Sequence, residues 1–174
     1  MGINLKQTES VGVDIRQLPN ELKVKICTGL ENNTMGLVNV TGNSMEPTIE
    51  DRGMVLMDTY DKTIENGYAY VFKIEGGLYK NYDEDTFCKR LSIDENGNLT
   101  ITSENARWKP FYFDSVDRIE IMGKVVASVA HGSNVLKEVT NKYEVMHSIP
   151  IAKNWDDVEK IMKRNKEIDE AQGA

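Results

Sequence analysis

The chain has 174 residues, of which 40% are hydrophobic and 28% charged, and its formal net charge is −7 with a sequence pI near 5.0. This length predicts one globular domain that can bury a real core. The acidic balance argues against a surface that neutralises many DNA phosphates, so strong DNA binding by this chain alone is excluded.

Cysteine and histidine usage excludes two further kinds of site. The two cysteines, Cys27 and Cys88, are too few for a disulfide framework and lack the paired spacing of a zinc site. The two histidines, His131 and His147, cannot form a metal cluster by themselves. We therefore expect no metal and no cofactor. Because the sequence contains neither a long apolar run nor an apolar signal-peptide core, we expect a cytoplasmic protein without a membrane contact.

The first 35 residues mix polar and apolar positions without a sustained period. Residues 29–34, with the sequence GLENNT, are typical of a loop before regular structure begins. We therefore interpret residues 1–35 as an N-terminal arm or linker.

Short strands are expected from residue 37 onward, because segments rich in β-branched and aromatic residues alternate with turn residues. The clearest turns are residues 75–77 and 94–98, and Asn96-Gly97 can supply the positive φ angles of a tight hairpin loop. The pattern predicts a mainly β fold, a sandwich or partly open barrel of short antiparallel strands. The strands are expected at residues 37–41, 54–58, 68–74, 86–93, 99–102 and 119–129.

Residues 131–174 are interpreted as a C-terminal extension that contains a helix at about 154–171. Asn154 is a suitable N-cap, and acidic residues at 156 and 157 suit the first turn of a helix. The helix either packs its apolar stripe on the β domain or docks on another subunit, and the sequence leaves both alternatives open. The stripe consists of Trp155, Val158, Ile161, Met162 and Ile168.

A candidate nucleophile lies in residues 40–49, with the sequence VTGNSMEPTI. Gly42 permits an unusual backbone geometry, and Pro47 prevents Ser44 from lying inside a continuing helix. Ser44 is therefore expected on a turn that leaves a strand, where main-chain N–H groups can face a developing oxyanion. By itself this pattern is weak, because most serines in turns bond their own backbone.

The Ser44 hydroxyl needs a base, and neither histidine has a partner pattern that would orient it. The expected strand at 86–93 places Phe87, Lys89 and Leu91 on one face. Burial on that face would lower the pKa of Lys89 from about 10.4 toward neutrality, as a general base requires. The alternative is that Lys89 lies near a sheet edge and extends its ammonium group to water.

Four groups of residues then follow one another in a specific order: 42–49 (GNSMEPTI), 89–91 (KRL), 103–105 (SEN) with Pro110 behind it, and 121–126 (IMGKVV). They resemble the successive motifs of the LexA/UmuD-type serine peptidases, a family that includes the self-cleaving C-terminal domains of phage repressors. The resemblance covers roughly residues 36–130. It implies a LexA-like C-terminal peptidase fold, mainly β, that dimerises, with residues 36–130 as the peptidase and dimerisation domain.

The resemblance also implies a Ser-Lys dyad. Ser44 would be the nucleophile, Lys89 the neutral general base, and the main-chain N–H groups of Ser44 and Met45 the oxyanion hole. Lys80 is a competing lysine, but Lys89 is preferred because Arg90 and Leu91 follow it as in the family.

A scissile bond is harder to assign. Members of the family cleave themselves at an Ala-Gly or Cys-Gly pair before the serine, and this sequence contains neither. The candidate is the bond between Val11 and Gly12, although a β-branched residue before the bond fits a small pocket badly.

We therefore expect the C-terminal regulatory domain of a phage or stress-response (SOS) transcriptional repressor that carries a latent, self-cleaving Ser-Lys peptidase. The expected partners are a second copy in a homodimer or higher oligomer, a RecA filament as co-protease, and a protein bound by the C-terminal helix. DNA would be bound only through a helix-turn-helix domain absent from this chain. The alternatives are a catalytically silent dimerisation or partner-binding module and a UmuD-like accessory factor of a translesion polymerase.

Overall fold

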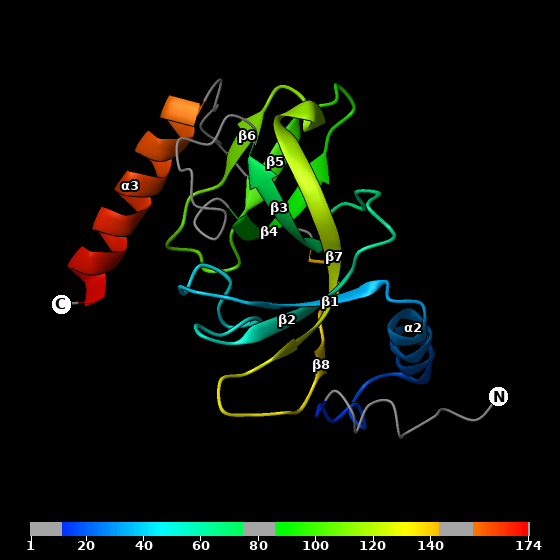
Figure 1. Ribbon diagram of the computed structural model, residues 1–174. Coiled ribbons are helices and arrows are strands. Elements are labelled where there is room, and N and C mark those ends of the chain that lie inside the picture. Colours follow the sequence, from blue (N-terminus) through cyan, green and yellow to red (C-terminus); the bar gives the residue numbers. More distant parts are fainter. Residues whose placement is uncertain (1–11, 75–85, 143–154, 174) are drawn as a thin grey trace.

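The computed structural model describes residues 12–74, 86–142 and 155–173, and its described part is mainly β (Figure 1). The strands form one antiparallel sheet, which confirms the expected fold class. Residues 54–58, 86–93, 99–102 and 119–129 are strands with the predicted bounds. The strands are β1 (Met35–Asn39), β2 (Met54–Asp58), β3 (Ala69–Ile74), β4 (Thr86–Ile93), β5 (Leu99–Thr102), β6 (Phe111–Phe113), β7 (Ile119–Val129) and β8 (Lys137–Glu138).

Strand β7 joins the two halves of the sheet, whose strand order is β1-β2-β7-β3-β4-β5-β6, with β8 also paired to β7. Its second half pairs with β2 and its first half with β3, and Lys124 lies opposite both Asp58 and Tyr70. The register shifts in β2 and in β3 mark bulges, which bend and twist a sheet. Because of this curvature, β1 and β4 border one cavity although they are not neighbours in the sheet.

The core lies on both faces of this curved sheet. One cluster joins the ring of Phe72 to side chains of β4, β5 and β6, where every second residue of β5 and β6 is buried. A second cluster lies between β2, β3 and β7 and includes Met45 and Ile49 from the segment after β1. The second cluster therefore fixes the segment that carries the candidate nucleophile.

Helix α2 (Asn20–Glu31) lies within the segment that the sequence indicated as an arm or linker. Ile26 and Cys27 are buried in a third cluster with Ile15 and Leu18, against β2 and β7. Regular structure therefore begins before residue 35, and only Asn32 and Asn33 of the expected loop form a turn. The sequence pattern missed α2 because few of its residues are buried, so it has only a short apolar stripe.

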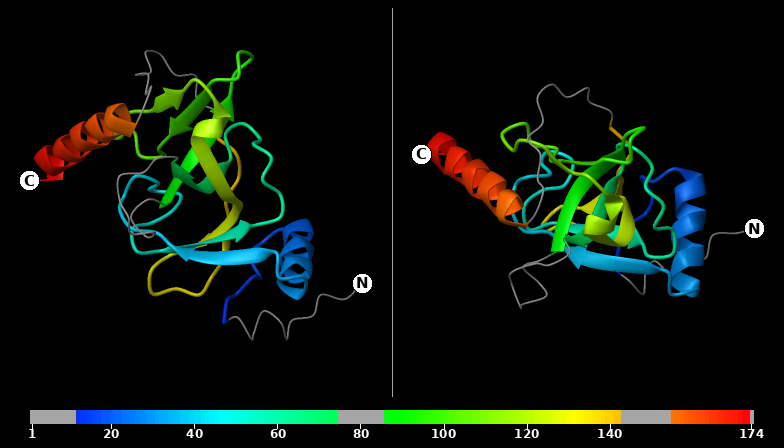
Figure 2. Two further views of the ribbon diagram at one scale, coloured as in Figure 1. Left: turned by 45° about the horizontal axis from the view of Figure 1, so that its top comes forward. Right: turned by 90° about the horizontal axis from the view of Figure 1, so that it is seen from above.

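Helix α3 (Trp155–Gly173) confirms the expected C-terminal helix and lies on the opposite side of the molecule from α2 (Figures 1 and 2). Val158 is fully buried in the cluster of Phe72, and Met162 packs against that cluster. These contacts favour packing on the β domain. Neither α2 nor α3 is long and apolar enough to cross a membrane. Asn154 and the side chains of Trp155, Ile161 and Ile168 are outside the described residues.

Two short strands and one turn differ from expectation. β6 and β8 were not predicted, because three and two residues give too little alternation to detect. The turn between β4 and β5 does not use two positive φ angles; Gly97 has φ of 82°, while the Asp94 carboxylate accepts hydrogen bonds from the amides of Asn96 and Asn98. The expected turn at residues 75–77 is outside the described residues.

Candidate active site

Ser44 lies on a turn between β1 and β2 that is fixed from several sides. The amide of Gly42 donates to the Asp51 carboxylate at 2.8 Å, and the carbonyl oxygen of Ser44 accepts from the Asn105 amide at 2.9 Å. The next side chain, Met45, is 1% exposed and packs in the core. The Ser44 hydroxyl therefore projects from a rigid turn, as the sequence predicted.

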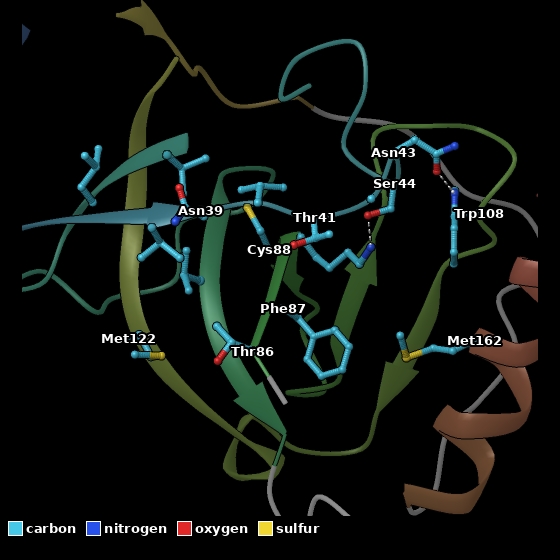
Figure 3. A pocket seen from close by; sticks show the side chains of 17 residues that line it. Asn39, Thr41, Asn43, Ser44, Thr86, Phe87, Cys88, Trp108, Met122 and Met162 are labelled. Atoms are coloured by element: carbon cyan, nitrogen blue, oxygen red, sulfur yellow. Dashed lines mark hydrogen bonds between the residues drawn. The ribbon is translucent and has the colours of Figure 1, made fainter. Parts of the chain in front are cut away.

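Lys89 lies on β4 opposite Tyr70 of β3, one residue before the pairing of β4 with β5 begins, and it is only 8% exposed. The alternative that it reaches water from a sheet edge is therefore wrong. Its Nζ donates a hydrogen bond to Ser44 Oγ (Figure 3). Burial lowers the pKa of Lys89 from 10.5 to about 8, against a smaller opposing effect of Cys88. The structure thus brings together the two residues of the expected dyad and provides a physical reason for a neutral amine.

Trp108 covers this pair and was not among the predicted site residues. Its indole N–H donates to Asn43 Oδ1 at 3.0 Å (Figure 3). The main-chain carbonyl oxygen of Asn43 accepts from Asn105 Nδ2 at 3.2 Å. Lys89 Nζ lies 5.5 Å from the centroid of the Trp108 ring. The loop after β5 therefore holds the turn that carries Ser44 and places an aromatic ring beside the Lys89 amine. The only sequence signal was its place between the third motif and Pro110.

A buried ion pair connects two of the motifs behind the dyad. Arg90, the residue after Lys89, pairs with Glu104, and both side chains are about 95% buried. Glu104 also accepts a hydrogen bond from Thr48 Oγ1 at 2.9 Å and lies 3.3 Å from Lys142 Nζ. Burial raises the pKa of Glu104, but the hydrogen bonds from Arg90 and Thr48 outweigh it and lower that pKa. This network fixes β4 relative to the end of the Ser44 turn.

The dyad opens into a cavity of about 880 Å³. Its walls come from β1 and the turn after it, from the first half of β4, and from α3. The lining is largely apolar, so a peptide would be separated from bulk water beside the dyad. Residues that line it away from the dyad include Val40, Thr86, Phe87, Cys88, Met122 and Met162.

Of the other residues considered for the site, the two that the structure describes, His131 and Gly12, do not join this cluster. His131 lies exposed in the turn after β7 and does not line the cavity. Gly12 is exposed, with φ of +74°, and Val11 is outside the described residues, as are Lys80 and His147. Both cysteines are free. Among the described residues, no group of three or more His, Cys, Asp or Glu side chains could hold a metal ion.

The oxyanion donors stay a prediction. In the described part of the chain, hydrogen bonds around this turn use the amide of Glu46 and the carbonyl oxygens of Asn43, Ser44 and Met45. None of these hydrogen bonds uses the main-chain amide of Ser44 or of Met45.

Comparison with known protein families matches residues 3–126 to the family described as Peptidase S24-like. The matched range includes Ser44, Lys89 and Trp108 and ends within β7, before the segment that contains α3. No curated protein matches the chain.

Proposed function

Because the chain belongs to the S24 family of peptidases, we propose that Ser44 and Lys89 form a catalytic dyad that cleaves a peptide bond of this chain. The observation that carries the proposal is the hydrogen bond between the buried Lys89 amine and the Ser44 hydroxyl. Burial that lowers the pKa of a lysine makes its neutral form available as a base near physiological pH.

The reaction follows from this geometry. Neutral Lys89 accepts the proton of Ser44 as Oγ attacks the carbonyl carbon of the scissile bond, and main-chain N–H groups stabilise the oxyanion. The protonated amine then gives that proton to the leaving nitrogen, so the C–N bond breaks and an acyl ester on Ser44 remains. Lys89 next removes a proton from water, whose oxygen attacks the ester. The protonated amine then returns this proton to Ser44 Oγ as the C–O bond of the ester breaks, so the carboxyl product leaves and both residues regain their starting forms.

The position of the substrate is suggested by β1. It is the outermost strand on its side of the sheet in the described part of the chain, and residues 37–44 line the cavity. A peptide in extended conformation pairs with the free edge of β1 and passes Ser44 at the end of that strand.

The dyad is tested by holding the purified chain at alkaline pH and measuring its intact mass over time. We expect two fragments from the native sequence and none from Ser44→Ala or Lys89→Ala. Lys62→Ala and Ser133→Ala are matched controls, because both residues are exposed and neither lines the cavity. Cleavage that persists in Ser44→Ala would show that Ser44 is not the nucleophile and would contradict the proposed dyad.

We further propose that the chain is the regulatory domain of a phage or stress-response repressor, in which self-cleavage ends repression. The supporting observations are the family and the net charge of −7, which leaves DNA binding to another domain. A basic helix-turn-helix segment encoded upstream in the same reading frame would support this role. A start codon at residue 1 beside a polymerase gene would instead favour the accessory factor. Sedimentation of the purified chain tests the dimer, and faster cleavage with added RecA filaments tests the co-protease.

A further inference from the structure

Helix α3 lies outside the residues that match the family, yet one of its side chains lines the catalytic cavity. We propose that α3 is a wall of this cavity and that Met162 determines the size of the group that reaches Ser44. The effect of Met162 on which peptides are cleaved rests on the proposed function, whereas its effect on which groups reach Ser44 does not.

The first step is the attachment of α3 to the β domain. Val158 is fully buried among Tyr70, Phe72 and Leu91, which belong to β3 and β4. Met162 is four residues later and therefore lies on the same face of the helix, one turn further along. Val158 thus anchors α3 at the position that places Met162 at the cavity.

The second step is the group of side chains that Met162 joins. Figure 3 shows Met162 pointing from α3 toward the ring of Phe87, and Trp108, which lines the same cavity, lies on the side of Met162 that is nearer to Ser44. The Phe87 ring is itself held, because it stacks on Phe72 with centroids 5.9 Å apart. Two aromatic rings and a thioether therefore line one part of the cavity.

The third step is the chemistry of this part of the cavity. A methionine side chain is unbranched and polarisable, so it adapts to neighbouring apolar groups and makes favourable contacts with aromatic rings. This part of the cavity is thus suited to an apolar side chain of limited size, because its described lining residues Phe87, Trp108 and Met162 carry no charge that could pair with a charged group.

The face of α3 that points away from the β domain is charged. Its described exposed side chains are charged, and these include Lys160, Lys163, Arg164, Lys166 and Glu167. An apolar face on the β domain and a charged face in water is the pattern of a helix docked on its own chain.

Access to the cavity can be measured without catalysis by placing a thiol at the nucleophile. Ser44→Cys is treated with a small methanethiosulfonate and with a bulky aryl maleimide, and peptide mapping gives the rate of labelling at position 44. The native cysteines interfere little, since burial raises the pKa of Cys88 to about 12 and Cys27 is buried in the core.

We expect Met162→Ala to raise the ratio of bulky to small labelling rates by at least about fivefold, and Met162→Trp to lower it, because pocket size controls which groups enter. Lys163→Ala, on the exposed face of α3, should leave the ratio unchanged. Circular dichroism checks the fold, and Met162→Phe replaces Met162→Trp if the latter does not fold. Equal ratios in the enlarged and reduced variants would overturn the proposal. A ratio that depends on protein concentration would also overturn it, because the wall would then belong to a second copy.

The cleavage arm uses the chain with Ser44 intact. If the dyad is active, Met162→Ala should accept peptides with a larger apolar residue beside the cut bond than the native chain does. Absence of cleavage in every variant would count against the proposed function. The labelling ratio would still show whether Met162 limits access to position 44.

Discussion

The amine of Lys89 is buried among largely apolar side chains, and its charged form is therefore destabilised by the loss of water around it. Its pKa of about 8, against 10.5 in water, corresponds to roughly 3 kcal/mol between the two protonation states. The protein keeps this group in an interior strand, where the Ser44 hydroxyl is its polar partner. A cost of this size indicates a group retained for chemistry rather than for stability.

The rate of self-cleavage should therefore depend on pH through Lys89. Only the neutral amine accepts the Ser44 proton, so the rate is expected to rise as the pH increases through about 8 and to level off above it. Intact mass measured over time in a series of buffers gives the profile. A rate that does not change across this range would argue against Lys89 as the base.

The same burial predicts a gain in stability when the charge is removed. The folded pKa lies below the unfolded one, so the unfolded chain binds more protons between about pH 8 and 10.5, and stability rises with pH in that window. Lys89→Met should therefore stabilise the fold at neutral pH by about 1 to 3 kcal/mol, and the gain should shrink as the pH approaches 10.5. Urea unfolding at both pH values measures this. A loss of stability at neutral pH would show that the ammonium is better solvated than its burial indicates.

At the scale of single elements, α2 is attached to the sheet by a few apolar side chains and one ion pair. Ile26 is fully buried, and Lys25 lies 3.2 Å from the Asp58 carboxylate on β2. Burial raises the pKa of Asp58, but main-chain N–H donors and Lys25 outweigh it and lower that pKa. α2 is thus part of the folded unit and not a linker.

Ile26→Ala tests this attachment. Removing a fully buried isoleucine side chain should lower the free energy of unfolding by about 2 to 5 kcal/mol. Val24→Ala on the same helix is the control, because Val24 is 51% exposed and its removal should change stability by about 0.5 kcal/mol or less. Equal effects of the two substitutions, measured by urea unfolding, would mean that α2 is not docked in solution.

The sequence predicts those features that are set by neighbouring residues, and it does not predict contacts between residues that are far apart in the chain. The bounds of β4 and β7 follow from alternation within each segment, and Ser44 and Lys89 follow from motifs around each residue. Trp108 was missed because its partner, Asn43, is 65 positions away and nothing near Trp108 indicates the contact. The same reason applies to Met162: its apolar stripe predicts burial, but the partner of that stripe is set by the curvature of the sheet.

At the scale of the whole molecule, the turn that carries Ser44 and the N-terminal segment lie apart. The Ser44 turn follows the last residue of β1, whereas Ile15 and Leu18 pack with α2, which precedes the first residue of β1 (Figure 1). Asp14 is also hydrogen-bonded to the turn before β8, through its amide to Asn134 and its carbonyl oxygen to Leu136. Five residues of β1 span about 16 Å, while three residues of extended chain reach at most about 11 Å.

This separation predicts how a bond between Val11 and Gly12 would be cut. The carbonyl group of this bond belongs to Val11, three residues before the Asp14 anchor, so we expect that it does not reach Ser44 of the same molecule while that anchor holds. Cleavage there should occur between two copies. When Ser44→Ala chains carrying a mass label are mixed with the native chain at alkaline pH, we expect the labelled chains to be cut at this bond. If only the native chains are cut, the segment at residues 14–18 must leave its site on the sheet before each reaction, and weakening it by Leu18→Ala should then accelerate cleavage.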